Sequence, residues 1–187
     1  MIKDSEFIKN PDVPGPTKEE IRCILLCKSN VSKEDIVVDI GCGTGGLTVE
    51  FAKKAKNVYA IDLNPLAIQT TQKNSLKHGV EKKVKVIKGD GLDVLDDLED
   101  FDVLIIGGSS GKLPELIKKG FKKLKKNGTI LVTSILLETA TEAISTFKEL
   151  SIKPEVVNIM ITRGNSGDRG TMMLSNNPIT VISTKKL

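Results

Sequence analysis

The residues best suited to bind a ligand follow a short apolar run, residues 36–40, in which Asp39 is the one charged side chain. Glycines then occupy every second position, at Gly41, Gly43 and Gly45. An apolar run of this length that ends in glycines is typical of a strand buried on both faces, followed by a tight turn and a helix. Glycine lets backbone N–H groups approach a ligand where a Cβ would block them. The stretch therefore predicts a small-molecule pocket.

Three classes of ligand bind at glycine-rich turns of this kind, and neighbouring residues separate them. A triphosphate loop requires Lys followed by Ser or Thr at the start of its helix, whereas residues 45–48 read GGLT. The GxGxxG pattern of dinucleotide-binding folds is present, and Asp62 lies where an acid would hold a ribose hydroxyl. Asp39 favours another ligand, because an anion before the first glycine would repel a pyrophosphate and attract a cation. S-adenosylmethionine, which carries an ammonium and a sulfonium, fits these charges.

Two further groups of residues are expected beside this turn. Residues 89–91 (GDG) follow a predicted strand over 84–88, and residues 107–109 (GGS) follow a predicted strand over 102–106. The carboxyl ends of parallel strands meet at one edge of a sheet, where ligands bind. The second group is expected to face a second substrate. For residues 89–91, a simple turn remains the alternative.

Apolar periodicity predicts strands and helices that alternate along the chain. Strands are expected over residues 36–40, 58–61, 84–88, 102–106, 129–134, 157–162, 171–175 and 178–184, and helices over residues 17–28, 47–56, 65–78, 113–125 and 136–147. This α/β order predicts a doubly wound, mostly parallel seven-stranded sheet with helices on both faces. The last strands, which no helix separates, predict a C-terminal antiparallel hairpin that a nicotinamide-binding domain would not normally have.

Length and composition predict one enzyme domain. The chain has 187 residues, of which 39% are hydrophobic, enough to bury a full core. Cys23 and Cys27 are one helical turn apart and are expected in the core, and since His78 is the one histidine, the sequence predicts no metal site. No apolar run approaches the ~20 residues of a membrane helix. The N-terminus MIKDSEFIKN lacks a signal-peptide core, so we expect a cytoplasmic protein without a membrane partner.

The distribution of positive charge is more informative than the net charge of +4. Arginine occurs three times, at Arg22, Arg163 and Arg169, and the other basic residues are lysines spread over predicted helix faces. Arg163 and Arg169 fall in one glycine-rich stretch, residues 163–170 (RGNSGDRG), which is predicted to be a loop. Because arginine binds carboxylates with a planar fork, this pair predicts an acidic ligand or a clamp on a neighbouring subunit.

The N-terminal segment is predicted to be an extended arm, because residues 10–16 contain three prolines. Thr17 begins the sequence TKEE, in which Thr17 and Glu20 form a capping-box pattern for the helix that follows. The arm is long enough to fold over the glycine turn.

Three motifs resemble those of class I S-adenosylmethionine-dependent methyltransferases: VVDIGCGTG, AIDLNPLAI and GDG. The resemblance implies a Rossmann-like domain over residues 1–187, with residues 1–16 as its arm. It implies that Asp62 holds the ribose and that residues 90 and 91 lie against the adenine. The implied cofactor-binding residues are Asp39, Gly41, Cys42, Gly43, Thr44, Gly45, Asp62, Asp90 and Gly91.

A narrower resemblance covers essentially the whole chain. FIKNPDVPGPT, VVDIGCGTGG, AIDLNP, GGSSGKL, ILLET and RGNSGDRGTMM are similar to the CbiT family of cobalt-precorrin C15-methyltransferases. That family implies conversion of cobalt-precorrin-6B to cobalt-precorrin-7 in cobalamin biosynthesis, with loss of the carboxyl group of the carbon-12 acetate, by a homotetramer. It implies that the arm brings Thr17 to the cofactor. The expected substrate contacts are Gly107, Gly108, Ser109, Arg163 and Arg169. Because an electron-rich ring carbon is itself the nucleophile, no catalytic residue is assigned.

Two other functions are compatible with the same motifs. One is a tRNA adenine N1 methyltransferase, which would also suit a positive surface, although six aromatic residues offer little for base stacking. Methyltransferases of exocyclic base amines usually carry prolines and an aromatic after the fourth strand, where this chain reads GGSSG. We therefore expect no nucleic-acid partner. The other is a regulator that binds S-adenosylmethionine without catalysis.

Overall fold

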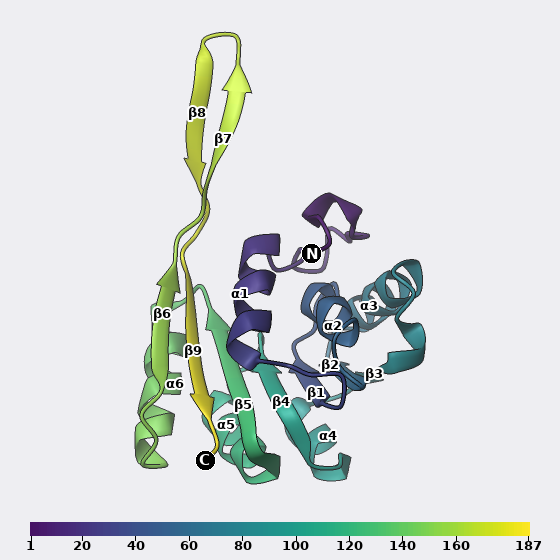
Figure 1. Cartoon of the computed structure of the whole chain (residues 1–187), viewed down its shortest axis with the longest axis vertical. Coiled ribbons are helices and arrows are strands. Elements are labelled where there is room, and N and C mark those ends of the chain that lie inside the picture. The colour runs from purple at the N-terminus through teal and green to yellow at the C-terminus, as the bar shows by residue number, and fades with distance from the viewer.

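The computed structural model describes residues 1–187 and has a seven-stranded sheet at its centre (Figure 1). The strand order is β3-β2-β1-β4-β5-β9-β6, and β9 runs antiparallel to both of its neighbours while the other pairings are parallel. The strands are β1 (Ile36–Ile40), β2 (Asn57–Asp62), β3 (Val84–Lys88), β4 (Phe101–Ile106), β5 (Leu124–Ser134), β6 (Glu155–Ile159) and β9 (Ile179–Lys185). The doubly wound, mostly parallel sheet predicted from the sequence is confirmed.

Helices cover both faces of the sheet, because successive side chains of each strand point to opposite sides. Val37 packs with one face and Val38 with the other. The helices on the face of Val37 are α1 (Glu19–Ser29) and α2 (Gly46–Ala52), with α3 (Pro65–Lys77) beside them, and those on the face of Val38 are α4 (Gly91–Asp97), α5 (Leu113–Lys123) and α6 (Leu137–Glu149) (Figure 1). Two 3₁₀ turns, η1 (Asp4–Glu6) and η2 (Glu81–Lys83), complete these layers. None of the helices is both long and apolar enough to cross a membrane.

The predicted element boundaries are right for most strands and wrong at a few positions. Strand β5 begins at Leu124 rather than at residue 129, and α2 ends at Ala52 rather than at residue 56. Helix α4 is not predicted by the sequence pattern, since its seven residues make about two turns and give no clear period. Its N-terminus is nevertheless capped, because the Asp90 carboxylate accepts a hydrogen bond from Leu92 N at 2.9 Å.

The stretch at residues 163–170, predicted to be a loop, is a β-hairpin. Strands β7 (Thr162–Gly167) and β8 (Gly170–Ser175) pair with each other in a separate two-stranded sheet that projects from the body (Figure 1). Every residue of both strands is exposed, so β7 has no buried apolar face to produce a strand pattern. The predicted antiparallel strands also occur within the main sheet, as the β9 pairings with β5 and β6.

The capping box predicted at Thr17 is wrong. Helix α1 begins at Glu19, its N-cap is Lys18, and no side chain makes a cap hydrogen bond there. The Glu20 carboxylate binds Arg163 instead, as an acceptor of three hydrogen bonds of 2.6 to 3.1 Å. A tertiary ion pair has therefore replaced the local contact that the sequence suggested.

The prediction that Cys23 and Cys27 pack in the core is also wrong. Cys23 and Cys27 are exposed, because the buried side of α1 carries Ile21, Arg22 and Leu25. Cys42 alone is buried. A charged residue thus occupies a position on α1 where the periodicity would favour an apolar one.

Candidate functional site

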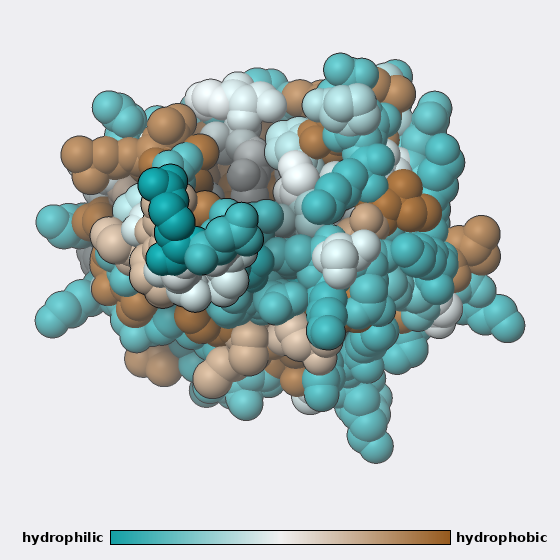
Figure 2. Space-filling model, turned by 90° about the horizontal axis from the view of Figure 1, so that it is seen from above, coloured by the Kyte–Doolittle hydropathy of each residue, from teal (hydrophilic) through white to brown (hydrophobic).

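A cavity of about 300 Å³ opens at the carboxyl ends of the parallel strands. Figure 2 looks down on this end of the molecule and shows a hollow bordered by pale atoms of near-neutral hydropathy next to the projecting hairpin. Twelve of the predicted site residues line the cavity: Thr17, Asp39, Gly41, Cys42, Gly43, Thr44, Asp62, Asp90, Gly91, Gly107, Gly108 and Ser109. Residues from four strand ends therefore meet at one cavity with Thr17, which directly follows the arm.

The glycine turn has the backbone geometry for which glycine is needed. Gly41, Gly43 and Gly45 have φ angles of +77°, +56° and +81°. Gly45 does not line the cavity, because it packs against α3, where a Cβ would lie 2.9 Å from Thr71 Oγ1. Its conformation starts α2, whose N-cap it is. Gly45 thus shapes the turn from behind, while its neighbours face the cavity.

Asp62 holds the glycine turn at the end of β2. One carboxylate oxygen accepts a hydrogen bond from Gly43 N and the other from Asn64 N, both at 2.9 Å. Asn64 in turn caps α3, since its side chain accepts from Leu66 N at 2.9 Å. Each carboxylate oxygen can accept a second hydrogen bond, so Asp62 can bind a ligand hydroxyl from a fixed position.

Asp39 is a buried carboxyl group on the cavity wall, with 1% of its surface exposed. Thr48 Oγ1 donates a hydrogen bond to it at 2.6 Å. Burial raises the pKa of Asp39 to about 6, the nearby Asp62 carboxylate acts in the same direction, and the Thr48 hydrogen bond partly offsets both. An anion in this position is costly without a countercharge, so the site favours a cationic ligand.

Asp90 lines the cavity and forms an ion pair with a lysine of the next loop. Lys112 Nζ lies 2.6 Å from Asp90 Oδ2, and this ammonium together with the Leu92 N–H group lowers the pKa of Asp90. Lys112 ends the segment that begins with Gly107, so the ion pair joins the loops after β3 and β4. The ion pair therefore favours the ionised form of the Asp90 carboxylate.

Several lining residues are not predicted from the sequence. Pro14 and Gly15 belong to the predicted arm, Ser110 lies in the loop after β4, and Thr133 lies near the end of β5. Thr133 lies at the same sheet edge as residues 107–109, so its place at this edge could have been predicted in the same way. The left-handed backbone of Ser110, with a φ of +49°, has no sequence signal.

The structure does not bring Arg163 or Arg169 to the cavity. Arg163 donates from Nε and Nη2 to the Glu20 carboxylate, so its charge is paired within the chain. Arg169 lies in the turn of the β7–β8 hairpin. Substrate contact by either residue remains a prediction, and within one chain the geometry gives it no support.

Comparisons with known proteins agree with this architecture. A family model described as a precorrin methyltransferase domain matches residues 15–186. A relative from Methanothermobacter thermautotrophicus, named probable cobalt-precorrin-6B C(15)-methyltransferase (decarboxylating), is 47% identical over 184 residues, which cover 98% of this chain and 96% of the relative.

Two solved structures have the same fold over nearly their full length. The crystal structure of precorrin 8W decarboxylase from Methanobacterium thermoautotrophicum has a TM-score of 0.96 and 47% identity, and covers 98% of this chain and 99% of its own. That of precorrin-6Y C5,15-methyltransferase from Geobacter metallireducens has a TM-score of 0.92 and 27% identity, and covers 100% of this chain and 98% of its own. This protein therefore belongs to the precorrin methyltransferase family, a family of methyltransferase enzymes.

Proposed function

We propose that this protein transfers a methyl group from S-adenosylmethionine to carbon 15 of cobalt-precorrin-6B, with loss of the carboxyl group of the carbon-12 acetate as carbon dioxide. The product would be cobalt-precorrin-7, in anaerobic cobalamin biosynthesis. The observation that supports this most strongly is one cavity in which a glycine turn, a buried acid and a strand-end acid meet. The name of the Methanothermobacter relative supports the choice of substrate.

The residues of the cavity fit S-adenosylmethionine. Asp39 offers a buried carboxyl group to a cationic ligand, and Asp62 offers fixed acceptor oxygens to ribose hydroxyls. When bound, S-adenosylmethionine would supply a methyl carbon activated by a positive sulfur. We assign donor binding to Thr17, Asp39, Gly41, Cys42, Gly43, Thr44, Asp62, Asp90 and Gly91, with Gly45 acting through the shape of the turn.

Residues 107–109 are proposed to face the acceptor ring, since they line the same cavity at the end of β4. Their small side chains leave room for a large macrocycle. The main role of the protein is then to orient the two reactants, and orientation can lower a reaction barrier by ~7 to 11 kcal/mol. No side chain is assigned as a catalytic acid or base.

We also propose a homotetramer, for which the β7–β8 hairpin offers contact surface. Met172 and Met173 are 63% and 60% exposed on β8, so a neighbouring copy could cover them. In such an assembly Arg169, at the hairpin turn, could reach the cavity of another copy and bind a substrate carboxylate. Arg169→Lys should then raise the KM for cobalt-precorrin-6B severalfold without changing oligomer size by light scattering. An unchanged KM would show that Arg169 does not bind the substrate.

A turnover assay separates this function from its alternatives. Release of S-adenosylhomocysteine should require cobalt-precorrin-6B and should not occur with unmodified tRNA. A tRNA methyltransferase would instead turn over with tRNA, with affinity that falls steeply with salt. A regulator would bind S-adenosylhomocysteine in calorimetry and release none in either assay. Binding of NAD in place of S-adenosylhomocysteine would contradict the donor assignment.

Because the pKa of Asp39 is raised, we expect the affinity for the methyl donor to fall at acid pH. The pKa of Asp39 in the folded chain is about 6, raised from an ordinary value of 3.8, so ionisation of Asp39 at neutral pH costs stability. This cost is relieved as the pH falls through 6. The ligand ammonium group, which S-adenosylhomocysteine keeps although it lacks the sulfonium, binds the ionised form of Asp39 better. Calorimetry should therefore give a Kd for S-adenosylhomocysteine up to about tenfold higher at pH 5 than at pH 7.5, since about a tenth of Asp39 is ionised one unit below its pKa. Asp39→Asn should bind weakly and lack this pH dependence. Equal pH dependence in the two proteins would contradict the assignment.

A further inference from the structure

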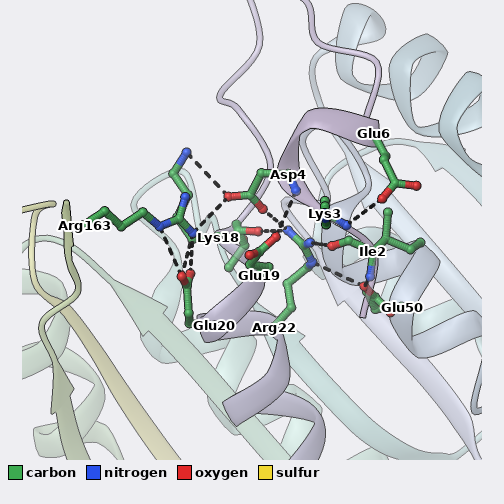
Figure 3. Close-up of polar contacts among 11 residues, drawn as sticks. Ile2, Lys3, Asp4, Glu6, Lys18, Glu19, Glu20, Arg22, Glu50 and Arg163 are labelled. Atoms are coloured by element: carbon green, nitrogen blue, oxygen red, sulfur yellow. Dashed lines mark hydrogen bonds and ion pairs between the residues drawn. The ribbon is translucent and has the colours of Figure 1, made fainter. Parts of the chain in front are cut away.

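Arg22 is a charged side chain with 0% of its surface exposed, and its contacts make it unlike the other arginines (Figure 3). Nη1 donates to the Asp4 carboxylate at 2.7 Å and to the carbonyl oxygen of Thr17, and Nη2 donates to the carbonyl oxygen of Ile2. The guanidinium carbon lies 4.8 Å from the centre of the Phe7 ring. All four partners belong to residues 1–17, so one side chain of α1 binds the N-terminal segment at several points.

Glu50 completes the surroundings of Arg22 from the other side. It is a buried residue of α2, the helix that follows the glycine turn, and its Oε1 lies 3.6 Å from Arg22 Nε. The same oxygen accepts a hydrogen bond from Ile2 N at 2.6 Å. Burying a guanidinium is costly unless its charge and its donors are compensated. Here Nη1 and Nη2 donate hydrogen bonds to the N-terminal segment, whereas Nε makes no hydrogen bond and has the Glu50 carboxylate at ion-pair distance. Arg22 therefore joins two elements that meet at the cavity.

The segment from Pro14 to Thr17, which we call the strap, forms one wall of the cavity through Pro14, Gly15 and Thr17. It lies against the glycine turn, because a Cβ on Gly46 would be 3.1 Å from Pro16 Cβ and 3.5 Å from Thr17 N. The Arg22 contact to the Thr17 carbonyl is the one hydrogen bond that the strap makes. Apart from this contact, packing alone holds the strap over the turn.

We infer that Arg22 is a positioning residue for methyl transfer: it fixes the strap against the glycine turn and so closes the donor cavity on that side. The role rests on the proposed function, because the strap affects catalysis only if the donor occupies this cavity. Arg22 itself does not line the cavity, so it would act through Thr17 rather than by contact with the donor.

The test compares Arg22→Lys with a variant of matched stability that leaves the strap alone. A lysine keeps the charge, but its single nitrogen cannot serve the separate partners of a guanidinium fork. Phe147→Leu is the control, since Phe147 is fully buried in α6 on the opposite face of the sheet. Calorimetry on folded protein should show that Arg22→Lys raises the Kd for S-adenosylhomocysteine about tenfold. For Phe147→Leu, at a similar loss in melting temperature, the Kd should stay within about twofold.

A second pair of variants covers the case in which Arg22→Lys does not fold. Asp4→Asn removes the carboxylate that Arg22 binds, whereas Glu20→Gln weakens the neighbouring Arg163 pair and leaves Arg22 with its partners. We expect a severalfold rise in Kd for Asp4→Asn and no change for Glu20→Gln. Equal Kd values for Arg22→Lys and Phe147→Leu, or for Asp4→Asn and Glu20→Gln, would overturn the positioning role. If the unsubstituted chain binds no S-adenosylhomocysteine, the proposed function fails first and this role fails with it.

Discussion

Gly41→Ala should strongly weaken binding of S-adenosylhomocysteine and destabilise the fold. Gly41 has a φ of +77°, and a Cβ there would lie 2.5 Å from Gly108 N and 2.8 Å from Gly108 Cα. Both obstacles are backbone atoms of the loop after β4, so the loops after β1 and β4 would have to separate. We expect a loss of about 2 to 6 kcal/mol in unfolding free energy, from about 1–3 kcal/mol of left-handed strain and about 1–3 kcal/mol of overpacking. Affinity measured on the folded fraction should fall roughly a hundredfold or more, which is about 2.7 kcal/mol.

Gly79→Ala is the matched control for this variant. Gly79 has a φ of +68°, but nothing lies within 4 Å of the position that its Cβ would take. The control carries the same kind of backbone strain at the end of α3, outside the cavity, so it should lose about 1 kcal/mol or somewhat more and keep its donor affinity. Urea unfolding and calorimetry on both variants make the comparison. Donor affinity in Gly41→Ala equal to that in Gly79→Ala would contradict the assigned role of the glycine turn.

Asp62→Ala should weaken donor binding by about 1.5 to 3 kcal/mol, the range for hydrogen bonds to a charged group, which corresponds to roughly 10- to 150-fold in Kd. Two effects contribute in the same direction. The proposed ribose contact is lost, and Gly43 N loses its 2.9 Å acceptor, so the glycine turn is less well fixed. Calorimetric titration with S-adenosylhomocysteine gives the Kd directly.

Asp35→Ala separates the ligand contact from the general loss of a carboxylate. Asp35 also accepts two hydrogen bonds, from Ser32 N at 2.7 Å and Ser32 Oγ at 2.9 Å, but it does not line the cavity. Its removal should lower the melting temperature slightly and leave the Kd unchanged. If both variants bind S-adenosylhomocysteine like the unsubstituted chain, Asp62 is not a donor ligand.

The part of the site that lies at strand ends is predictable from the sequence for a simple physical reason. Once β1 to β4 are recognised as buried parallel strands, topology places their carboxyl ends at one edge. Asp39, Asp62 and Asp90 then need no further information to be brought to a common cavity. The glycines of the turn are predictable for the same reason, because their spacing follows from the backbone conformation that a strand-to-helix turn requires.

The features that sequence patterns miss depend on contacts between residues of different structural elements. Glu20, which the sequence predicts to cap α1, binds the guanidinium of Arg163 instead. Arg22 is buried because the N-terminal segment, some twenty residues away in the chain, supplies hydrogen-bond acceptors for its guanidinium. Strand β7 has exposed side chains throughout, so its pairing with β8 leaves no hydrophobic alternation in the sequence. In each case the deciding partner lies on another element, where periodicity carries no information.

The most direct test of the proposed reaction is the mass of the corrinoid after incubation of the protein with S-adenosylmethionine and cobalt-precorrin-6B. We expect a product that has gained one methyl group in place of a hydrogen and lost one carbon dioxide, with one S-adenosylhomocysteine released per product. Recovery of unaltered cobalt-precorrin-6B from a protein that binds S-adenosylhomocysteine would contradict the proposed reaction.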